Sequence, residues 1–211
     1  AIASRPGLLN KLIPFSDPDV GLYVVRLFRD RVPIDVVVDD LIPCYAQSLN
    51  PLFGQNRDPN EMWVAIIEKA YAKLCGSYSA LAGGCESDAM TDLTGGVTFQ
   101  VDTNSQAQKD IKSFWAQLKL YQEQGAFMAC SCNRPGTDYY GIVPNHAYGV
   151  LSLHDVTLNN GTTVELVKVR NPWSTGKWVG SWSNSSPNHE WDSVDVAVKQ
   201  SIWYDPNSDQ E

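Results

Sequence analysis

The 211-residue sequence lacks any run near the roughly 18 continuous apolar residues typical of a membrane-spanning helix, so it predicts no membrane span. It also lacks an excess of basic residues, since 16 Lys and Arg stand against 24 Asp and Glu and the net charge is -8. This acidic balance argues against nucleic acid and anionic membrane surfaces as partners. The opening residues, Ala1 to Ser4, lack the charged segment of a signal peptide and read as part of a helix.

Cysteines are few and irregularly spaced, which disfavours a disulfide framework. The five are Cys44, Cys75, Cys85, Cys130 and Cys132. Their number is odd, and the last two are too close together for the usual two-residue metal knuckle. We therefore expect mostly buried, reduced thiols in a cytoplasmic protein.

Hydrophobic spacing predicts a mixed α+β chain. It indicates helices over 1–13, 61–74 and 105–123, and strands over 21–28, 32–38, 125–132, 147–153 and 163–169. Asn159-Asn160-Gly161 predicts a hairpin turn between the last two strands, because Asn-Gly tolerates positive φ. Thr94-Gly95-Gly96 is either a hinge between two lobes or a simple turn. The first half reads as helices with a small hairpin, and the second as a helix followed by antiparallel strands.

Two residues at the ends of one predicted hairpin are candidates for catalysis. His146, one of three histidines, opens the first strand, and Asn171 follows its partner. Taken singly, His146 is most simply a structural or surface residue. Asn171, which precedes Pro172, is most simply a residue that forms a turn. Antiparallel pairing brings these two strand ends together, however. A His that transfers protons and an Asn that orients it are two of three parts of a thiol-dependent acyl-transfer site, and Trp173 can cover them.

Several motifs in order resemble the papain-like protease core of the calpain family, over nearly the whole length. They are Asp35–Asp40 with Pro43, Glu61-Met62-Trp63, Glu68–Lys73, Leu81–Gly84, Thr94–Gly96, Asn145–Tyr148 and Arg170–Trp173, followed by Trp178, Gly180 and Trp182. The resemblance departs at Asn145, where calpains carry Gly. It implies that residues 1–95 are the C-terminal part of the first protease subdomain, a helical remnant. Residues 96–211 would be the second, antiparallel β-rich subdomain carrying His146 and Asn171.

The resemblance implies an intracellular cysteine endopeptidase that cleaves polypeptides without an organic cofactor. His146 would act as general base and then acid, Asn171 would orient it, and Trp173 would shield their bond. The catalytic Cys would lie a few residues before Ala1, so residues 1–211 alone are expected to be inactive. A non-catalytic, calpain-like scaffold or regulatory protein is the alternative. A carbohydrate-binding module built on the tryptophans is a third interpretation.

Calcium is the cofactor that the resemblance implies. Glu61 matches an acidic ligand of the first calpain site, although it also reads as an acid at a helix start. Asp209 and Glu211 match ligands of the second site, where Lys177 and Asn184 replace two acids. Because an ammonium repels the ion and calcium needs 6–8 oxygens, we expect no tightly bound calcium at this second site.

Overall fold

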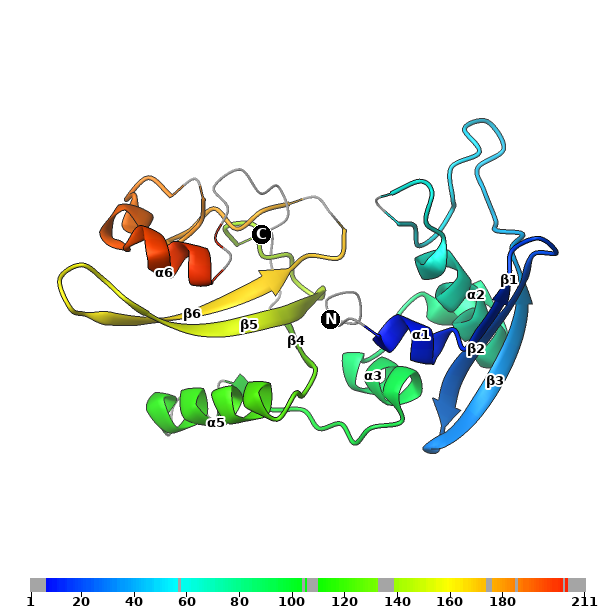
Figure 1. Ribbon diagram of the computed structural model, residues 1–211, viewed down its shortest axis with the longest axis horizontal. Helices are drawn as coiled ribbons and strands as arrows, with labels where there is room; N and C mark the ends of the chain where they lie inside the picture. The colour runs from blue at the N-terminus through cyan, green and yellow to red at the C-terminus, as the bar shows by residue number, and fades with distance from the viewer. Residues whose placement is uncertain are drawn as a thin grey trace. The chain divides into compact units, whose positions relative to one another are not determined.

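The chain folds as two compact units that divide near residue 101. The computed structural model describes residues 7–56, 58–103, 105, 110–132, 139–173, 176–184, 186–202 and 204. Each unit contains one three-stranded antiparallel sheet together with helices (Figure 1). The predicted α+β class is thus confirmed. The division falls a few residues after the predicted boundary at Gly95-Gly96, and the assignment of the units to two protease subdomains stays a prediction.

The first unit is a sheet of order β1-β2-β3 covered by short helices. Its elements are α1 (Leu8–Leu12), β1 (Phe15–Asp17), β2 (Leu22–Arg29), β3 (Val32–Asp39), α2 (Trp63–Cys75), the 3-10 helix η2 (Tyr78–Leu81) and α3 (Glu86–Thr94). Between β2 and β3 the chain turns at Asp30 and Arg31, both with positive φ, as a tight hairpin of matching twist requires. The predicted hairpin is confirmed.

The core of the first unit lies between α2 and one face of the sheet. Ile66, Ile67 and Ala70 recur at helical spacing on α2 and pack against alternate residues of β2 and β3 such as Val25 and Val36. These side chains are almost fully removed from water, and burial of each large aliphatic chain stabilises the fold by about 1.5–3 kcal/mol. Helix α2 ends because Gly76 adopts a left-handed φ of 100°.

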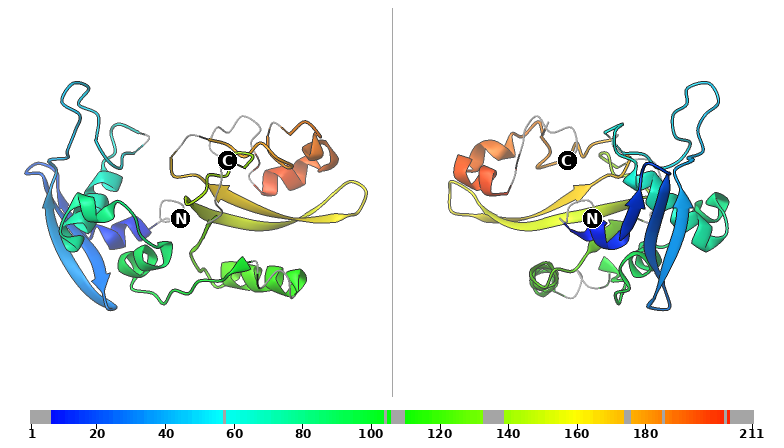
Figure 2. Two further views of the ribbon diagram at one scale, coloured as in Figure 1. Left: turned by 180° about the vertical axis from the view of Figure 1, so that it is seen from behind. Right: turned by 45° about the vertical axis from the view of Figure 1, so that its right-hand side comes forward.

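The second unit carries the sheet β4-β5-β6, in which β5 is central. Its elements are α5 (Ile111–Glu123), β4 (Met128–Ser131), β5 (Ala147–Thr157), β6 (Thr163–Arg170), the 3-10 helix η3 (Glu190–Ser193) and α6 (Val196–Ser201). Gly161, with φ of 83°, supplies the positive φ of the predicted turn between β5 and β6. Figures 1 and 2 show α5 and α6 on opposite sides of the β5–β6 ribbon. A helix therefore lies on each side of the long central hairpin.

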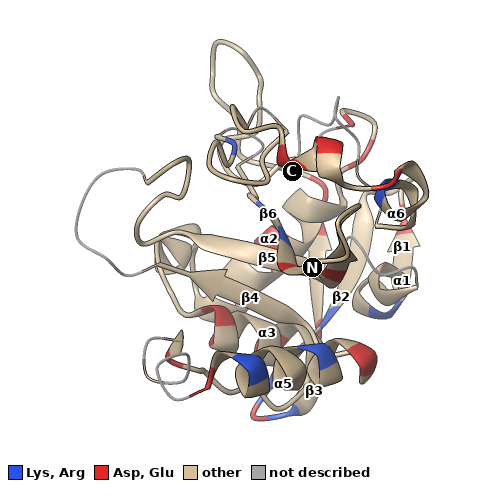
Figure 3. Cartoon of the chain, turned by 90° about the vertical axis from the view of Figure 1, so that its left-hand side faces the viewer, with Lys and Arg blue, Asp and Glu red and all other residues tan. Residues whose placement is uncertain are grey.

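Helix α5 is fastened to β5 through polar side chains. The side-chain amide of Gln122 accepts a hydrogen bond from Leu153 N–H at 2.6 Å and donates one to Leu153 C=O at 3.3 Å. Asp155 accepts hydrogen bonds from the Trp115 indole and from Lys119, one of the charged residues spread along α5 (Figure 3). Since β4 pairs with β5 only as far as Val150, Gln122 replaces a neighbouring strand for Leu153.

Two predicted helices are interrupted near their N-terminal ends. The helix predicted over 1–13 begins at Leu8, because Gly7 has a left-handed φ of 81° that interrupts any continuous helix; residues 1–6 lie outside the described part of the chain. In the region predicted as one helix over 105–123, Ser105 is helical, residues 106–109 lie outside the described part of the chain, and α5 begins at Ile111. Asp110 breaks the continuity, because it is extended and caps α5 by accepting Lys112 and Ser113 N–H. Strand β1 and helix α3 were not predicted.

The prediction of mostly buried cysteines is wrong. Cys44, Cys75, Cys85 and Cys130 are exposed, and Cys132 is half-buried. They lie in a loop, at helix ends and along the short strand β4, where the chain offers little apolar cover. None of the five forms a disulfide; that the thiols are reduced stays a prediction.

Candidate functional site

His146 is held at the entry to the central strand of the second unit. It directly precedes β5, and the residue before it, Asn145, adopts a left-handed φ of 54°. Asn145 N–H donates to Cys132 C=O at 2.7 Å, which ties this entry to the end of β4. The orientation of the His146 side chain is therefore set by the residues on either side of it, because Asn145 is hydrogen-bonded to Cys132 and Ala147 is paired with Ser131 in the sheet.

Asn171 meets His146 as the hairpin topology predicts. Strand β6 ends at Arg170, which pairs with Gly149 near the start of β5. Antiparallel pairing therefore places the residue after β6 beside the residue before β5. His146 Nε2 and Asn171 Oδ1 lie 2.8 Å apart in a part-buried setting. The predicted contact between the two side chains is present, while their catalytic role stays a prediction.

A third group determines the chemistry of this hydrogen bond. Trp173 N–H donates to Asn171 Oδ1 at 3.0 Å. A backbone N–H can only donate, so the amide oxygen, and not the NH2 group, occupies that position. Oxygen is only an acceptor here, so His146 Nε2 must carry the proton. The imidazole is thereby held in its Nε2–H tautomer, and Nδ1 is left as the basic nitrogen.

Two aromatic rings enclose the imidazole. The Trp173 ring lies over it, with ring centroids 3.9 Å apart and planes inclined by 34°. Tyr148 meets it edge-on, with centroids 4.9 Å apart and planes at 79°. Trp173 is 58% exposed and Tyr148 only 5%. The sequence predicted that Trp173 covers the imidazole but did not identify Tyr148. The one indication in the sequence was that Tyr148 lies two residues after His146, on the same face of the strand.

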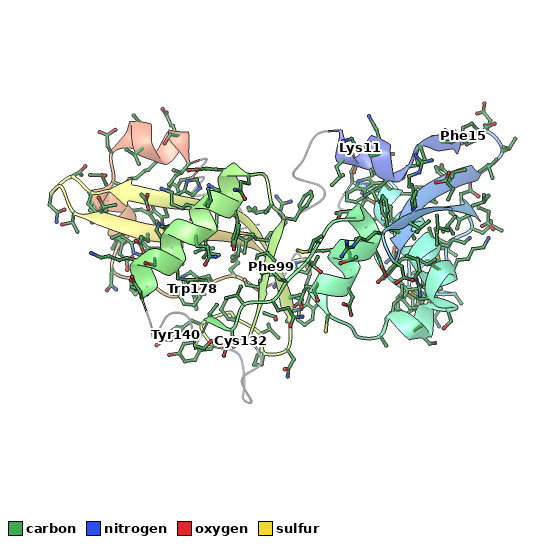
Figure 4. The ribbon with its side chains drawn as sticks, turned by 90° about the horizontal axis from the view of Figure 1, so that it is seen from below. Lys11, Phe15, Phe99, Cys132, Tyr140 and Trp178 are labelled. Atoms are coloured by element: carbon green, nitrogen blue, oxygen red, sulfur yellow. The ribbon has the colours of Figure 1, made fainter. Side chains whose placement is uncertain are left out.

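The two loops that bear His146 and Asn171 also pack against one another. Tyr140 and Trp178, labelled in Figure 4, meet edge to face with centroids 6.0 Å apart. Val179 N–H donates to Tyr140 C=O at 2.9 Å. Gly141 approaches Lys177 so closely that a Cβ atom there would lie 1.8 Å from the Lys177 carbonyl oxygen. The loop before β5 and the loop after β6 therefore form one packed assembly.

Three further tryptophans, Trp178, Trp182 and Trp191, build the loop after Asn171. Trp191 donates its indole N–H to Trp182 C=O at 3.0 Å, and the two rings meet edge to face. Trp178 donates its indole N–H to Ser181 C=O at 2.7 Å. Both indole N–H groups are thus used by backbone carbonyls of the same segment. This observation gives these rings a structural role, as the calpain resemblance implies for the loop.

Of the residues considered as calcium ligands, the structure describes only Glu61. Glu61 is exposed, and its Oε2 accepts hydrogen bonds from Asn56 Nδ2 and Trp63 Nε1. Across the described ranges, no group of three or more His, Cys, Asp or Glu side chains is arranged to hold a metal. Asp209 and Glu211 lie outside the described residues. The role of Glu61 as a calcium ligand stays a prediction.

The described residues include no helix with both the length and the apolar character needed to cross a bilayer.

Comparison with known proteins shows the family of this chain. The family model described as calpain family cysteine protease matches residues 1–211. The chain is 43% identical to calpain-type cysteine protease DEK1 of Zea mays over 181 residues, 82% of this chain and 8% of that protein. It is 37% identical to the calpain-1 catalytic subunit of Mus musculus, covering 92% of this chain and 28% of that protein. It is 34% identical to calpain-9 of Mus musculus, and the match covers 96% of this chain and 30% of that protein.

The chain thus spans less than a third of the length of each of these relatives. The match nevertheless extends over the whole sequence and includes the segments that bear His146 and Asn171. The chain belongs to the calpain family of cysteine proteases.

Proposed function

We propose that this chain provides the proton-transfer half of the active site of a calpain-like cysteine endopeptidase that cleaves polypeptides. The observation that carries the proposal is the 2.8 Å contact between His146 Nε2 and Asn171 Oδ1. Its polarity is set by the Trp173 N–H on the same oxygen. That arrangement leaves Nδ1 as the base, which is what deprotonation of a thiol requires.

In the proposed reaction, His146 Nδ1 takes the proton of a cysteine thiol, and the thiolate attacks the peptide carbonyl carbon. The imidazolium then returns the proton to the leaving amine as the C–N bond breaks, which leaves a thioester. Water, deprotonated by the same nitrogen, hydrolyses the thioester and regenerates the thiol. Asn171 Oδ1 accepts the Nε2–H bond throughout and stabilises the imidazolium, while the Trp173 ring limits the access of water to that bond.

The nucleophile is the part of the site that these residues do not supply. In the calpain pattern that this chain resembles, the catalytic Cys is followed by Trp, and none of the five cysteines here has that neighbour. We therefore propose that residues 1–211 alone do not hydrolyse peptides. Removing the nucleophile of such a unit costs nearly all of its catalysis, since His146 and Asn171 then have nothing to activate.

A non-catalytic scaffold or regulatory role is the second candidate, because protease folds include members without a nucleophile. The residue aligned with the family's catalytic Cys in the full coding sequence separates the two: Cys supports the peptidase and another residue supports the scaffold. Cytoplasmic location and calcium dependence remain proposals that follow from the family likeness. No step above is assigned to calcium, because Glu61 is engaged by Asn56 and Trp63.

The test is hydrolysis of casein or a fluorogenic peptide by the protein expressed from its full coding sequence. We expect turnover that His146→Ala abolishes. Asn171→Ala should lower kcat by about 10- to 100-fold, the cost of about 1.5–3 kcal/mol for a hydrogen bond to a charged group. His189→Ala is the matched control, since His189 lies in the loop after Asn171 and begins η3, and it should leave turnover unchanged. Turnover that survives His146→Ala would show that the proposed mechanism is wrong.

A further inference from the structure

We propose that Tyr148 is a positioning residue for His146, and that its hydroxyl group, through the turn before β5, sets the orientation of the imidazole. The Tyr148 ring packs nearly perpendicular to the His146 ring, and its hydroxyl oxygen holds the backbone that leads to His146. The kinetic consequence of this inference rests on the proposed function, whereas its structural consequence does not.

The first argument is the asymmetry of the two rings around the imidazole. Asn171 fixes one atom, Nε2, but a single hydrogen bond leaves the ring free to rotate about that contact. Trp173 lies on one side and is 58% exposed, so it can move with its loop. Tyr148 is 5% exposed, and its backbone pairs with Cys130 inside the sheet. Tyr148 is therefore the immobile wall against which the imidazole rests.

The second argument is the hydrogen bonding of the turn that delivers His146. Val143 N–H donates to the Tyr148 hydroxyl oxygen at 2.9 Å. Pro144 has no N–H, and Asn145 N–H donates to Cys132 C=O at 2.7 Å. Every backbone donor in these three residues is thus assigned. One of the two bonds that shape the turn depends on a side chain, and that side chain also contacts the imidazole.

The third argument is the left-handed backbone at Asn145, with φ of 54°. Such a conformation costs a non-glycine residue free energy and persists where its surroundings hold it in place. Here the surroundings are the bonds from Val143 and Asn145 on either side of Pro144. Loss of the Tyr148 hydroxyl would leave a part-buried Val143 N–H without its partner and would allow the turn to relax, carrying His146 with it.

The variant that isolates this role is Tyr148→Phe, which keeps the ring wall and removes only the acceptor. Tyr121→Phe is the matched control. It removes a hydroxyl that accepts a hydrogen bond from Gln117, so it is a loss of one tyrosine acceptor on α5 in the same unit. Should Tyr148→Phe fail to fold, 3,5-difluorotyrosine at position 148, measured at a pH low enough to keep its more acidic phenol protonated, weakens the hydroxyl as an acceptor while keeping the shape of the side chain. We expect the same changes from it, but smaller.

The kinetic readout is peptide hydrolysis by the protein made from its full coding sequence. We expect kcat of Tyr148→Phe to fall roughly 5- to 30-fold, the scale of one lost hydrogen bond to a buried donor. KM should change less than about twofold, because an interaction that orients the base acts on the transition state and not on substrate binding. Tyr121→Phe should leave both constants unchanged. A Tyr148→Phe enzyme with the kcat of the Tyr121→Phe enzyme would overturn the inference.

The second readout does not need activity. Imidazole 15N chemical shifts distinguish the Nε2–H from the Nδ1–H tautomer, and His154→Gln and His189→Gln assign the signals of the three histidines. We expect a single Nε2–H tautomer for His146 in the wild-type protein and in Tyr121→Phe, and a mixture of tautomers in Tyr148→Phe. Identical His146 signals in all three proteins would overturn the positioning role. Tautomer mixing in a protein that shows no peptidase activity even as wild type would support positioning and refute the proposed function.

Discussion

Gln122→Met tests whether a single side chain of α5 holds the central strand of the second unit in place. Gln122 makes two hydrogen bonds to the backbone of Leu153, accepting its N–H at 2.6 Å and donating to its C=O at 3.3 Å. Leu153 is 3% exposed. Methionine matches glutamine in length but makes neither bond, so the substitution leaves one donor and one acceptor unpaired in a part-buried place.

The magnitude follows from the cost of unpaired buried polar groups. Each costs about 1–3 kcal/mol, and the longer of the two bonds belongs at the low end. We therefore expect Gln122→Met to lower the free energy of unfolding of the second unit by about 2–4 kcal/mol. Gln122→Glu separates the two bonds, because a carboxylate accepts Leu153 N–H but cannot donate to its C=O. Its loss should lie between those of the wild type and Gln122→Met.

The assay is urea denaturation followed by tryptophan fluorescence. Six of the seven tryptophans lie beyond residue 101, and the seventh is Trp63. A Trp63→Phe background therefore reports on the second unit alone. Gln117→Met is the matched control, since Gln117 lies on the same helix, is exposed, and bonds to Tyr121 of that helix. It should cost no more than about 0.5 kcal/mol. A Gln122→Met loss within that range would refute the reasoning.

Two further substitutions test the packing of the same unit. Gly141→Ala should lower the free energy of unfolding of the second unit by about 2–4 kcal/mol in urea denaturation, because the new Cβ would lie 1.8 Å from the Lys177 carbonyl oxygen. Gly161→Ala is the control, since Gly161 has a similar positive φ but open space around it, and it should lower that free energy by only about 1–2 kcal/mol. The Lys119 ammonium holds the pKa of Asp155 below its ordinary value of 3.8, so Asp155 stabilises the fold above that value and loses its contribution as the pH falls through the lower folded pKa. The difference in urea midpoint between wild type and Asp155→Asn should therefore shrink below about pH 4, and a difference that grows on acidification would contradict this account.

Much of the candidate site was readable from local sequence. The Asn-Gly turn joins two apolar strands, so the strand ends that carry His146 and Asn171 had to meet. The β2–β3 hairpin and helix α2 were readable for the same reason, since their hydrophobic periods of two and 3.6 residues are properties of contiguous segments. Family motifs then connected these segments to one chemistry. In each case the deciding contacts join residues that are near in sequence or linked by one tight turn.

Other features depended on contacts between distant segments. The start of α5 at Ile111 was missed because the Asp110 side chain accepts hydrogen bonds from Lys112 and Ser113 N–H, so that Asp110 caps the helix and does not continue it. Hydrophobic spacing carries no information about such a side-chain cap. The exposure of the cysteines followed from where helices and strands ended and not from the residue type. Short elements such as β1 are specified by pairing with β2 and carry little periodicity of their own.

The sequence by itself determined the α+β class, the two hairpins and the His146–Asn171 pair, because short-range spacing dictates strand pairing and turn geometry. Only the tertiary structure decided how that pair is held. The amide orientation of Asn171 depends on the backbone of Trp173, the imidazole rests on Tyr148, and β5 is fixed by Gln122 of α5. Such contacts are set by side-chain direction and burial after the segments have packed, and no spacing along the chain encodes them.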